Sequence, residues 1–519
     1  MKDHSGQSIS TWMATATLPT FPTLAKNEHA DVCIVGAGIA GLTTAYLLGR
    51  AGKSAVVVDD GPIVSGETER TTAHLTTALD DRYFELERLH GEKGAHLAAE
   101  SHAAAIDQIE RIVAEEKIDC DFERLDGYLF APPGESVEIL EKELAASHRV
   151  GLTQVRMLAR SPLVSFDIGP SLRFPRQAQF HPLKYLAALA QAIIRDGGRI
   201  YTHTHANKIE GGDPARIETR NGPVLTADAV VVATNTPVND LLAIHTKQSA
   251  YRTFVIGAIV PSGSVRKGLY WDTPNPYHYI RLQSVPGNGN SSTAADMLIV
   301  GGEDHKTGQA DDAEDRYLEL EKWARTRFPM MGEIKFRWSG QVMEPIDGLA
   351  FIGRNPMDND NVYIATGDSG NGMTHGAIAG MLLTDLIQGR ENAWASLYDP
   401  SRKTLSAITR FAEENLNAAV QYADWLTPGD IDEDVSVSPG TGAIVRRGLT
   451  KIAVYCDAAG KLHECSAICP HLGGIVAWNH SEKTWDCPCH GSRFNKFGNA
   501  LNGPANTDLS PVEEVLSPE

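Results

Sequence analysis

Long apolar runs, an excess of basic charge and a secretion signal are all missing from this chain of 519 residues. No apolar run reaches the roughly 18 residues that a membrane-spanning helix needs, so we expect no membrane partner. Acidic residues outnumber basic ones by 66 to 47, and the formal net charge of −19 argues against nucleic acid as a main partner. The first residues lack a basic stretch followed by an apolar core, so the predicted location is the cytoplasm.

Cysteine is also scarce, with seven residues in the whole chain, and its distribution is uneven. Cys33 and Cys120 stand alone, whereas the other five lie close together between residues 456 and 489. In a reducing compartment, such crowding indicates a metal site rather than a set of disulfides.

The chain is long enough, with 42% apolar residues, to bury the cores of two or three domains. Residues 1–27 are polar, which predicts an N-terminal arm without a core of its own. Residues 427–442 are acidic and rich in proline and glycine, a composition typical of a linker. We therefore expect a main domain over residues 28–425 and a small C-terminal domain over residues 426–519.

Residues 30–60 carry the pattern around which the main domain is organised. An apolar strand leads into glycines in GxGxxG spacing, then a helix, then a second strand that ends at Asp59. The glycines of a dinucleotide site allow a tight turn, approach of the backbone to a pyrophosphate and close helix packing, and the acid accepts ribose hydroxyls. A lone GxGxxG also arises by chance, but the complete unit predicts dinucleotide binding. The candidate residues are Gly36, Gly38, Ile39, Ala40, Gly41, Asp59 and Asp60.

A polar loop follows over residues 61–80, in which threonine, serine and glycine are frequent. Its hydroxyls and backbone N–H groups can wrap a ligand, and Arg70, Thr71 and Thr72 are its candidate cofactor-binding residues. The alternative is an ordinary polar loop that ends in a helix N-cap.

A second glycine-rich turn between a strand and a helix begins after the predicted strand from Val362 to Ala365. The N-terminus of the following helix can stabilise negative charge on a reduced cofactor ring through its backbone N–H groups. A generic capped turn is the alternative. The candidate cofactor-binding residues are Gly367, Gly370, Asn371, Gly372, Met373 and Thr374.

Alternating strands and helices in the main domain favour a parallel sheet. A helical hairpin or a long pair of helices is predicted over residues 83–116, and an amphipathic helix over residues 181–194. The segment from Tyr270 to Val300 is more strand-like, and period-two alternation puts residues 277, 279 and 281 on one face. Such a face can bind a substrate carboxylate, or it can be a solvated strand face. The candidate substrate residues are Tyr277, Tyr279, Arg281 and His375.

No further GxGxxG that follows a strand and opens a helix occurs between Asp59 and Val362. An enzyme that takes hydride from a nicotinamide usually carries a second such site. The absence favours an organic substrate as the source of electrons.

The C-terminal domain contains a C-x-H pair and, about 15 residues later, a C-x-x-H pair. The four side chains are Cys469, His471, Cys487 and His490. Two thiolates and two imidazoles can bind one zinc ion or a [2Fe–2S] cluster with two histidines on one iron. The C-x-H spacing is awkward for a single tetrahedral ion, so the pattern favours the cluster, with zinc and structural cysteines as alternatives.

The stretch CPHLGG…WDCPCHGSRF resembles a Rieske [2Fe–2S] domain, and the resemblance implies that these four residues are the cluster ligands. Rieske proteins of high potential carry a second cysteine pair between the two loops. Here Cys489 matches one member and Gly474 stands at the other position. Phe494 stands where those proteins have a tyrosine that bonds a ligand sulfur. Because lost hydrogen bonds to cluster sulfur lower the potential, we expect a cluster of lower potential.

Residues from about 30 to 420 resemble the D-amino-acid oxidase-like family of FAD enzymes, which includes glycine and sarcosine oxidases. The matches are GAGIAGL, Asp59, SGETERTTAHLTT, the ATN strand end and DGLAFIG…ATGDSGNGMTHG. The resemblance implies an α/β fold: a Rossmann-type FAD domain with an inserted mixed-sheet substrate domain (about residues 80–185 and 240–340), followed by an all-β Rieske domain. Some relatives attach flavin to a histidine in the loop after the acid. Arg70 stands there, so we expect noncovalent FAD.

The resemblance implies an enzyme that oxidises the C–N bond of a small amine or amino acid with FAD. Its electrons are expected to pass to the Rieske cluster and on to an external acceptor, which favours a dehydrogenase over an oxidase that uses O₂. The alternative is a non-catalytic electron relay or redox sensor. A Rieske oxygenase is not expected, because the chain ends about 30 residues after His490, too soon for a mononuclear iron domain.

Overall fold

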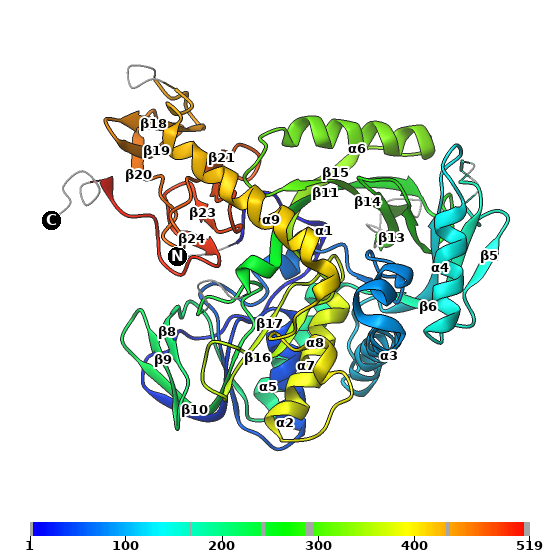
Figure 1. Cartoon of the computed structure of the whole chain (residues 1–519), viewed down its shortest axis with the longest axis horizontal. Coiled ribbons are helices and arrows are strands. Elements are labelled where there is room, and N and C mark those ends of the chain that lie inside the picture. Colours follow the sequence, from blue (N-terminus) through cyan, green and yellow to red (C-terminus); the bar gives the residue numbers. More distant parts are fainter. Residues whose placement is uncertain are drawn as a thin grey trace, which may run out of the picture.

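The computed structural model of the chain describes residues 4–163, 165–166, 168–239, 244–285, 295–431 and 436–512. Its strands form a layer of mainly parallel strands, a broad mixed sheet above it and a small C-terminal part beside both (Figure 1). No helix in these ranges is both long and apolar enough to cross a membrane.

The first sheet has eight strands, in the order β16-β17-β10-β1-β2-β7, with the hairpin of β8 and β9 beside β10. Neighbours are parallel from β17 to β7, and β16 is antiparallel to β17. Both faces of β1 are buried, as expected for a sheet covered on both sides, and the predicted parallel sheet is confirmed. The strands are β1 (Glu28–Val35), β2 (Ala55–Val58), β7 (Arg199–Tyr201), β8 (Ala206–Glu210), β9 (Ala215–Thr219), β10 (Val224–Val232), β16 (Phe351–Arg354) and β17 (Val362–Thr366).

Three helices pack on this sheet: α2 (Ile39–Arg50), α5 (Pro182–Arg195) and α7 (Gly372–Ile387). α5 confirms the helix predicted over residues 181–194, and its N-cap is His181, whose ring nitrogen accepts a hydrogen bond from the Lys184 N–H. α3 (Tyr83–Glu115) is interrupted by the non-helical backbone of Gly91, which makes it the predicted pair of helices.

The second sheet has nine strands, in the order β15-β11-β14-β13-β12-β4-β6-β3, with β5 beside β6. The pair of β4 and β12 is parallel and the other pairs are antiparallel, so this is the mixed sheet that the sequence predicted. α6 (Ala313–Arg327) lies over one of its faces (Figure 1), and α4 (Glu138–Arg149) lies near β5 and β6. The strands are β3 (His74–Leu75), β4 (Glu123–Phe130), β5 (Arg156–Leu158), β6 (Ser171–Gln179), β11 (Gln248–Pro261), β12 (Leu269–Asp272), β13 (Tyr279–Val285), β14 (Ala295–Lys306) and β15 (Ile334–Pro345).

The C-terminal part consists of a three-stranded and a four-stranded sheet. The strands are β18 (Gly442–Arg447), β19 (Thr450–Cys456), β20 (Leu462–Ser466), β21 (Ala477–Asn479), β22 (Thr484–Asp486), β23 (Arg493–Asn495) and β24 (Ala500–Asn502). Its side chains form clusters separate from those of the main domain, and Trp485 and Phe494 are fully buried there. The expected all-β domain is confirmed.

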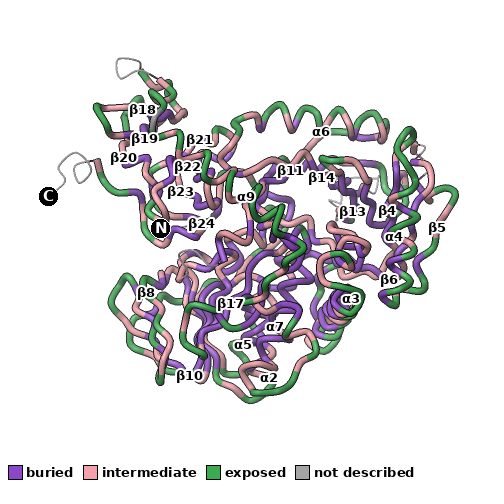
Figure 2. Tube along the Cα trace, in the orientation of Figure 1, coloured by how far each residue is buried: buried purple, intermediate pink, exposed green. Residues whose placement is uncertain are grey.

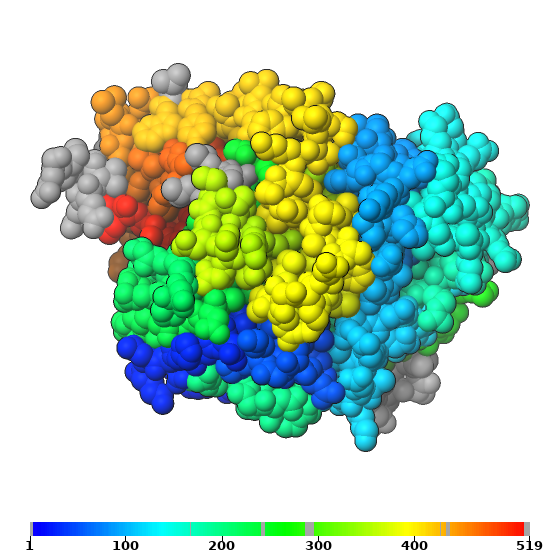
Figure 3. All heavy atoms as spheres, turned by 60° about the horizontal axis from the view of Figure 1, so that its bottom comes forward, coloured from blue at the N-terminus to red at the C-terminus, as the bar shows by residue number. Residues whose placement is uncertain are grey.

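The segment that joins the two parts runs over the surface after α7, through α8 (Ala395–Tyr398) and the short turn η3 (Leu405–Ala407) (Figure 3). α9 (Ile408–Gln421) has no buried residue and leads into the turn η4 (Tyr422–Leu426) (Figure 2).

The N-terminal arm contacts both domains, the main domain through a short helix, α1 (Thr11–Thr15), and the C-terminal domain through residues before it. Trp12 is fully buried and donates its indole N–H to the Thr71 carbonyl over 2.6 Å. The Ser5 carbonyl accepts a hydrogen bond from Arg493 of the C-terminal domain. Trp12 belongs to the core of the main domain, and the arm lies between the two domains, which composition did not predict.

Candidate redox site between the two domains

A cavity of about 260 Å³ opens where β1, β2, β10 and β17 end. Ligands of open α/β sheets bind at this edge. The second sheet lines the cavity through residues of β11, β13 and β15, and the segment from Ala500 to Asn506 of the C-terminal domain lines another part of its wall. The cavity therefore lies between the two domains.

The GxGxxG turn has the close contacts that a dinucleotide site requires. Gly36 has φ of 107°, and a Cβ there would lie 2.4 Å from the Ala233 carbonyl oxygen. A Cβ on Gly41 would lie 1.9 Å from the Gly36 oxygen, so Gly41 serves packing rather than lining the cavity. Gly38 is the N-cap of α2 and has no side chain to cap the helix. The turn thus fits a pyrophosphate at the helix N-terminus.

Asp59 lies just after β2, lines the cavity and also holds the glycine turn in place. Its carboxylate accepts hydrogen bonds from the N–H groups of Ala37, at 2.7 Å, and Gly61, at 2.9 Å. Asp60 lines the cavity beside it. A carboxylate has further lone pairs, so binding of ribose hydroxyls by Asp59 stays a prediction.

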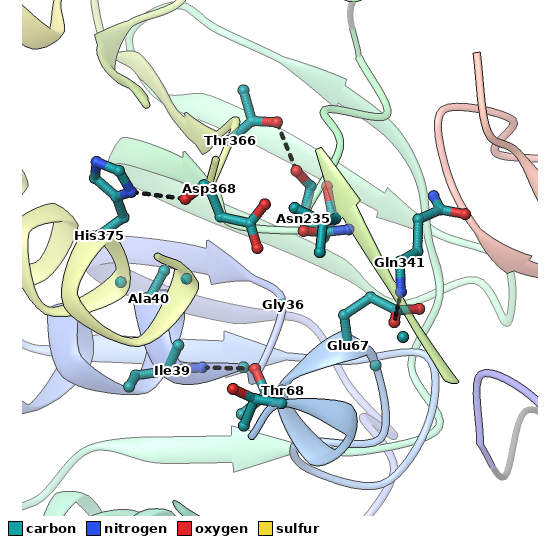
Figure 4. A pocket seen from close by; sticks show the side chains of 18 of the residues that line it. Gly36, Ile39, Ala40, Glu67, Thr68, Asn235, Gln341, Thr366, Asp368 and His375 are labelled. Atoms are coloured by element: carbon teal, nitrogen blue, oxygen red, sulfur yellow. Dashed lines mark hydrogen bonds between the residues drawn. The ribbon is translucent and has the colours of Figure 1, made fainter. Parts of the chain in front are cut away.

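The polar loop forms the side of the cavity opposite α7, and its 3₁₀ turn η1 (Glu67–Arg70) faces the start of α2. The Ile39 N–H donates to the Thr68 hydroxyl, as Figure 4 shows. Thr71 and Thr72 line the cavity. Arg70 also lines it, but its guanidinium donates to the Ser339 carbonyl and pairs with Glu482, so this charge is already satisfied.

The glycine-rich turn before α7 forms the opposite side, where Gly367, Gly370, Asn371, Gly372 and Met373 line the cavity. Figure 4 shows the Asp368 carboxylate pointing into the cavity. Burial raises the pKa of this carboxyl to about 7. Thr374 does not line the cavity, because its hydroxyl donates within the first turn of α7, to the Asn371 carbonyl.

The four candidate substrate residues have different positions. Tyr277 and Tyr279 line the cavity, although β13 begins only at Tyr279. His375 lines it with its imidazole turned away, toward the Asp368 carbonyl and the His102 ring (Figure 4). Arg281 is outside the cavity: it is fully buried and donates to the carbonyls of Thr72, Ala73 and Phe180. The expectation that Arg281 binds substrate is therefore corrected, because alternation alone does not tell a pocket from a core.

Sequence reasoning missed several residues that line the cavity: Trp271, Thr253, Asp80, Asp304, Gln341 and the segment from Ala500 to Asn506. They come from distant parts of the chain, and none of them stands in a recognisable motif. Asn235, in the ATN strand end, also lines the cavity, although it was not among the candidate site residues. The one available signal was Asp80 at the end of the polar loop.

The two loops that carry the predicted cluster ligands close in the same way. The Cys469 N–H donates to the Gly474 carbonyl, and the Cys469 carbonyl accepts from the Gly473 N–H. In the second loop, the Cys487 N–H donates to the Ser492 carbonyl, and the Cys487 carbonyl accepts from the Gly491 N–H. The bonded residues are separated along the chain by the same numbers of positions as in the first loop. The two loops thus present their side chains as a matched pair.

The four donor side chains lie together at one end of the domain. The two thiols are buried within hydrogen-bonding reach of each other, and the half-buried rings of His471 and His490 have centroids 5.0 Å apart. Among the described residues, no three Cys, His, Asp or Glu side chains converge as one metal ion requires. Two pairs of donors fit a two-iron cluster and not a single zinc ion.

Three neighbours bear on the properties of such a cluster. The Ser492 hydroxyl is within hydrogen-bonding reach of the Cys469 sulfur. Gly474 lies next to Cys489, since a Cβ on Gly474 would be 2.6 Å from the Cys489 sulfur. All seven cysteines are free thiols, so no disulfide joins the two ligand loops. Phe494 is fully buried and offers no hydroxyl. A low reduction potential stays a prediction from these residues.

The ligand loops face the main domain. His471 packs against His245 in the turn η2 (His245–Lys247), with ring centroids 4.9 Å apart. Gln341 of β15 lines the cavity and donates from Nε2 to the Gly491 carbonyl, next to His490. One side chain therefore contacts both the cavity and a ligand loop.

A buried network of charges joins the domains beside this contact. Glu482 is fully buried and forms an ion pair with Arg70, and Arg252 lies 3.9 Å from the same carboxylate. The hydroxyls of Ser8 and Ser339 donate hydrogen bonds to it. Burial alone raises the pKa of Glu482, but Arg70, Arg252 and Arg493 hold it below its ordinary value. A buried charge with this many partners fixes how the two domains dock.

The comparisons with known proteins agree with this arrangement. Residues 31–386 match the family described as FAD dependent oxidoreductase, and residues 429–513 match the Rieske [2Fe-2S] domain. The chain belongs to the FAD dependent oxidoreductase family and carries a C-terminal Rieske domain. FAD and a [2Fe–2S] cluster are accordingly its cofactors, and the residues at both sites fit them.

Two curated relatives and one solved structure illustrate the similarity. Bacillus subtilis (strain 168) YhfW, named as a Rieske 2Fe-2S iron-sulfur protein, is 33% identical over 510 residues, or 97% of each chain. The Escherichia coli (strain K12) γ-glutamylputrescine oxidoreductase is 27% identical over 73% of this chain and 88% of its own. Glycine oxidase from Geobacillus kaustophilus is 20% identical, covers 73% of this chain and 100% of its own, and has a TM-score of 0.58, which shows the shared fold.

Proposed function

We propose that this protein is a dehydrogenase that oxidises the C–N bond of a small amine or amino acid and sends the electrons through its Rieske cluster to an external acceptor. The observation that carries the proposal is that residues of the Rieske domain line the same cavity as the GxGxxG turn. Two redox groups with a shared interface are arranged for transfer between them. Placement in the cytoplasm is part of the proposal.

The reaction converts an amine into an imine, and the substrate gives up two electrons and two protons. FAD accepts such a pair and can release its electrons singly to a one-electron centre. The chain's own residues orient the substrate, and the burial of the cavity walls excludes water. The name of the E. coli relative, which contains γ-glutamylputrescine, supports a C–N substrate for this chain as well.

The docking of the domains supports transfer within one chain. The Gln309 amide donates to the Pro488 carbonyl and the Gln341 amide to the Gly491 carbonyl, so the second ligand loop is bound at two points. The first ligand loop is bound by Tyr422 and Trp425, which donate to the carbonyls of Leu472 and Gly473. With both loops held, electron transfer does not need the Rieske domain to swing away from FAD.

An anaerobic screen tests the proposal. Amines and amino acids are mixed with the FAD- and cluster-loaded protein, and the flavin absorbance is followed. Bleaching by one of these compounds supports an enzyme. Bleaching by reduced nicotinamide or a reduced protein alone, with no response to any amine or amino acid, favours the second candidate, a non-catalytic relay.

A further inference from the structure

One end of the cavity combines two carboxylates with three aromatic rings. The residues are Asp80, Asp304, Trp271, Tyr277 and Tyr279. They come from the polar loop, from β14 and from the region of β12 and β13, and they lie near the turn before α7. A Cβ on Gly370 of that turn would lie 2.0 Å from Asp80 Oδ2, which places the Asp80 carboxylate beside the predicted position of the reactive flavin ring.

The contacts within this group hold the side chains in place. The Tyr277 hydroxyl donates to Asp80 Oδ2 over 3.1 Å, and the hydroxyls of Tyr279 and Thr253 lie 2.7 Å apart. The two tyrosine rings have centroids 5.7 Å apart. Asp304 Oδ1 is buried and has no hydrogen-bond partner in the described structure. A buried carboxylate oxygen left without a partner calls for a donor from a ligand or from water.

Among the described residues, this end of the cavity has no cation available for a substrate carboxylate. Among its described lining residues there is no lysine, and the one arginine, Arg70, is committed to Glu482 and Ser339. Burial and Arg281 hold the pKa of His74 at about 3, and burial lowers that of His375 to about 4, so both rings are neutral. A third lining histidine, His205, lies beside Asp60 and the Asn506 carbonyl instead. In the residues outside the described ranges, the only lysine or arginine is Lys2.

More carboxyl groups lie behind the pocket. Glu344 is buried near Asp80, Asp81 and Asp368, and burial together with these carboxylates raises its pKa well above the ordinary value, so it keeps its proton. A cation would be stabilised by the ionised forms of Asp80 and Asp304 and by the faces of the aromatic rings, whereas a second anion would be repelled. The electrostatics of the pocket thus select for positive charge.

We propose that the substrate is an aliphatic diamine, in which one amine is oxidised and the other is held as an ammonium group by Asp80 and Asp304. This inference rests on the proposed function and narrows its substrate class from amines or amino acids to cationic amines. The oxidised end loses two electrons and two protons to become an imine, and the ammonium end keeps its proton. An α-amino acid would place its carboxylate where no arginine or lysine can receive it.

A matched pair of ligands tests this. 1,4-Diaminobutane and 4-aminobutyrate differ only in whether the far end is an ammonium or a carboxylate. Each is titrated anaerobically into the FAD-loaded protein, and the change in the oxidised flavin spectrum that precedes any reduction gives a dissociation constant. We expect the diamine to bind at least roughly tenfold more tightly, the effect of one hydrogen bond to a charged group.

Three variants sharpen the test. Asp304→Asn and Asp80→Asn should each weaken diamine binding roughly tenfold, whereas Asp304→Glu should keep the preference because it keeps the charge. Asp360→Asn, at an aspartate whose side chain is 95% exposed, is the control and should change nothing. Retained FAD absorbance shows that each variant is folded.

Equal binding of the two ligands, or tighter binding of 4-aminobutyrate, overturns the inference. Reduction of the flavin by an α-amino acid but not by the diamine also overturns it and leaves the proposed function standing. If the diamine binds preferentially but no amine or amino acid reduces the flavin, the substrate pocket is confirmed as cation-selective and the proposed oxidation fails instead.

Discussion

The ring of His245 meets the ring of His471 edge to face, with centroids 4.9 Å apart. His245 belongs to the FAD-binding part and His471 to the first ligand loop of the Rieske domain. The ring of His490 also lies near His245, at 6.5 Å. This contact puts the histidine end of the cluster site against the main domain.

Replacing His245 tests the importance of this contact. His245→Ala removes an aromatic pair worth about 1 kcal/mol, so we expect looser docking and slower reduction of the cluster, with unchanged bleaching of the flavin by substrate. Stopped-flow absorbance for the flavin and freeze-quench EPR for the cluster measure the two steps. His29→Ala, at an exposed histidine, is the control. An unchanged rate of cluster reduction would show that the ring contributes nothing to transfer.

Glu482 is the anion on which the interface network depends. Glu482→Gln leaves Arg70, Arg252 and Arg493 without their shared partner, and we expect a loss of about 3–5 kcal/mol in the free energy of unfolding. Glu319→Gln, at an exposed pair with Lys322, should cost less than about 1 kcal/mol. Urea denaturation measures both, and similar values for the two variants would contradict the network.

The pH dependence of this network has a definite sign. The pKa of Glu482 is lower in the folded protein than in the unfolded chain, because its three arginines outweigh burial. Its contribution to stability is therefore complete above pH of about 4.5 and is lost as pH falls further. Wild-type stability should fall steeply below that pH, and Glu482→Gln should lack this part of the acid sensitivity.

Asn502 tests whether the Rieske domain forms part of the FAD site. It donates to Glu67 over 2.7 Å, and its amide oxygen, on a residue that lines the cavity, is buried with no partner in the described structure. Asn502→Leu should weaken FAD binding roughly fivefold, the effect of losing one hydrogen bond of about 1 kcal/mol. Titration of the FAD-depleted protein by flavin fluorescence measures it. The control is Asn499→Ala, at an exposed residue just before β24. An equal FAD affinity in both variants would show that Asn502 does not contribute to FAD binding.

The substrate pocket should bind diamines more tightly as pH rises from about 5.5 to 8. Burial raises the pKa of Asp80 to about 6 and that of Asp304 to about 7, so both lose a proton in this interval. The stability of the protein without a ligand should change with pH in the opposite direction from the affinity. Asp80 and Asp304 favour folding below pH of about 4, and this contribution is lost as pH rises through 6 and 7. The groups that face the pair are Arg82, Asp81 and Tyr277 around Asp80, and Thr253, His278 and Arg316 around Asp304.

Titrations of 1,4-diaminobutane at several pH values measure this dependence. Affinity should rise roughly tenfold or more across the interval in the wild-type protein and much less in Asp304→Asn. A flat profile in the wild-type protein would mean that neither carboxyl changes its protonation on binding.

The sequence predicted those parts of the site whose chemistry depends on residues that are close together along the chain. Gly36 and Gly41 have contacts that no side chain tolerates, and such local constraints are written in the spacing of a motif. The ligand loops of Cys469 and Cys487 close by hydrogen bonds within six residues, so they too could be found along the chain.

Other features depend on which segments meet in space, and spacing does not encode that. Arg281 alternates with Tyr279 along β13, yet its side chain enters a core where backbone carbonyls bind it. Asp80 and Asp304 are separated by most of the main domain and become a pair only through the fold. The polar N-terminal arm gave no sign that its Ser8 would reach Glu482, which belongs to the other end of the chain.

The most direct test of the account follows both redox centres in one anaerobic experiment. The fully oxidised protein is mixed with less than one equivalent of an amine that bleaches the flavin, and EPR is recorded as the flavin absorbance changes. We expect a Rieske-type signal that rises as electrons leave the flavin, without any added mediator. A flavin that stays reduced beside a cluster that stays oxidised and EPR-silent would contradict it.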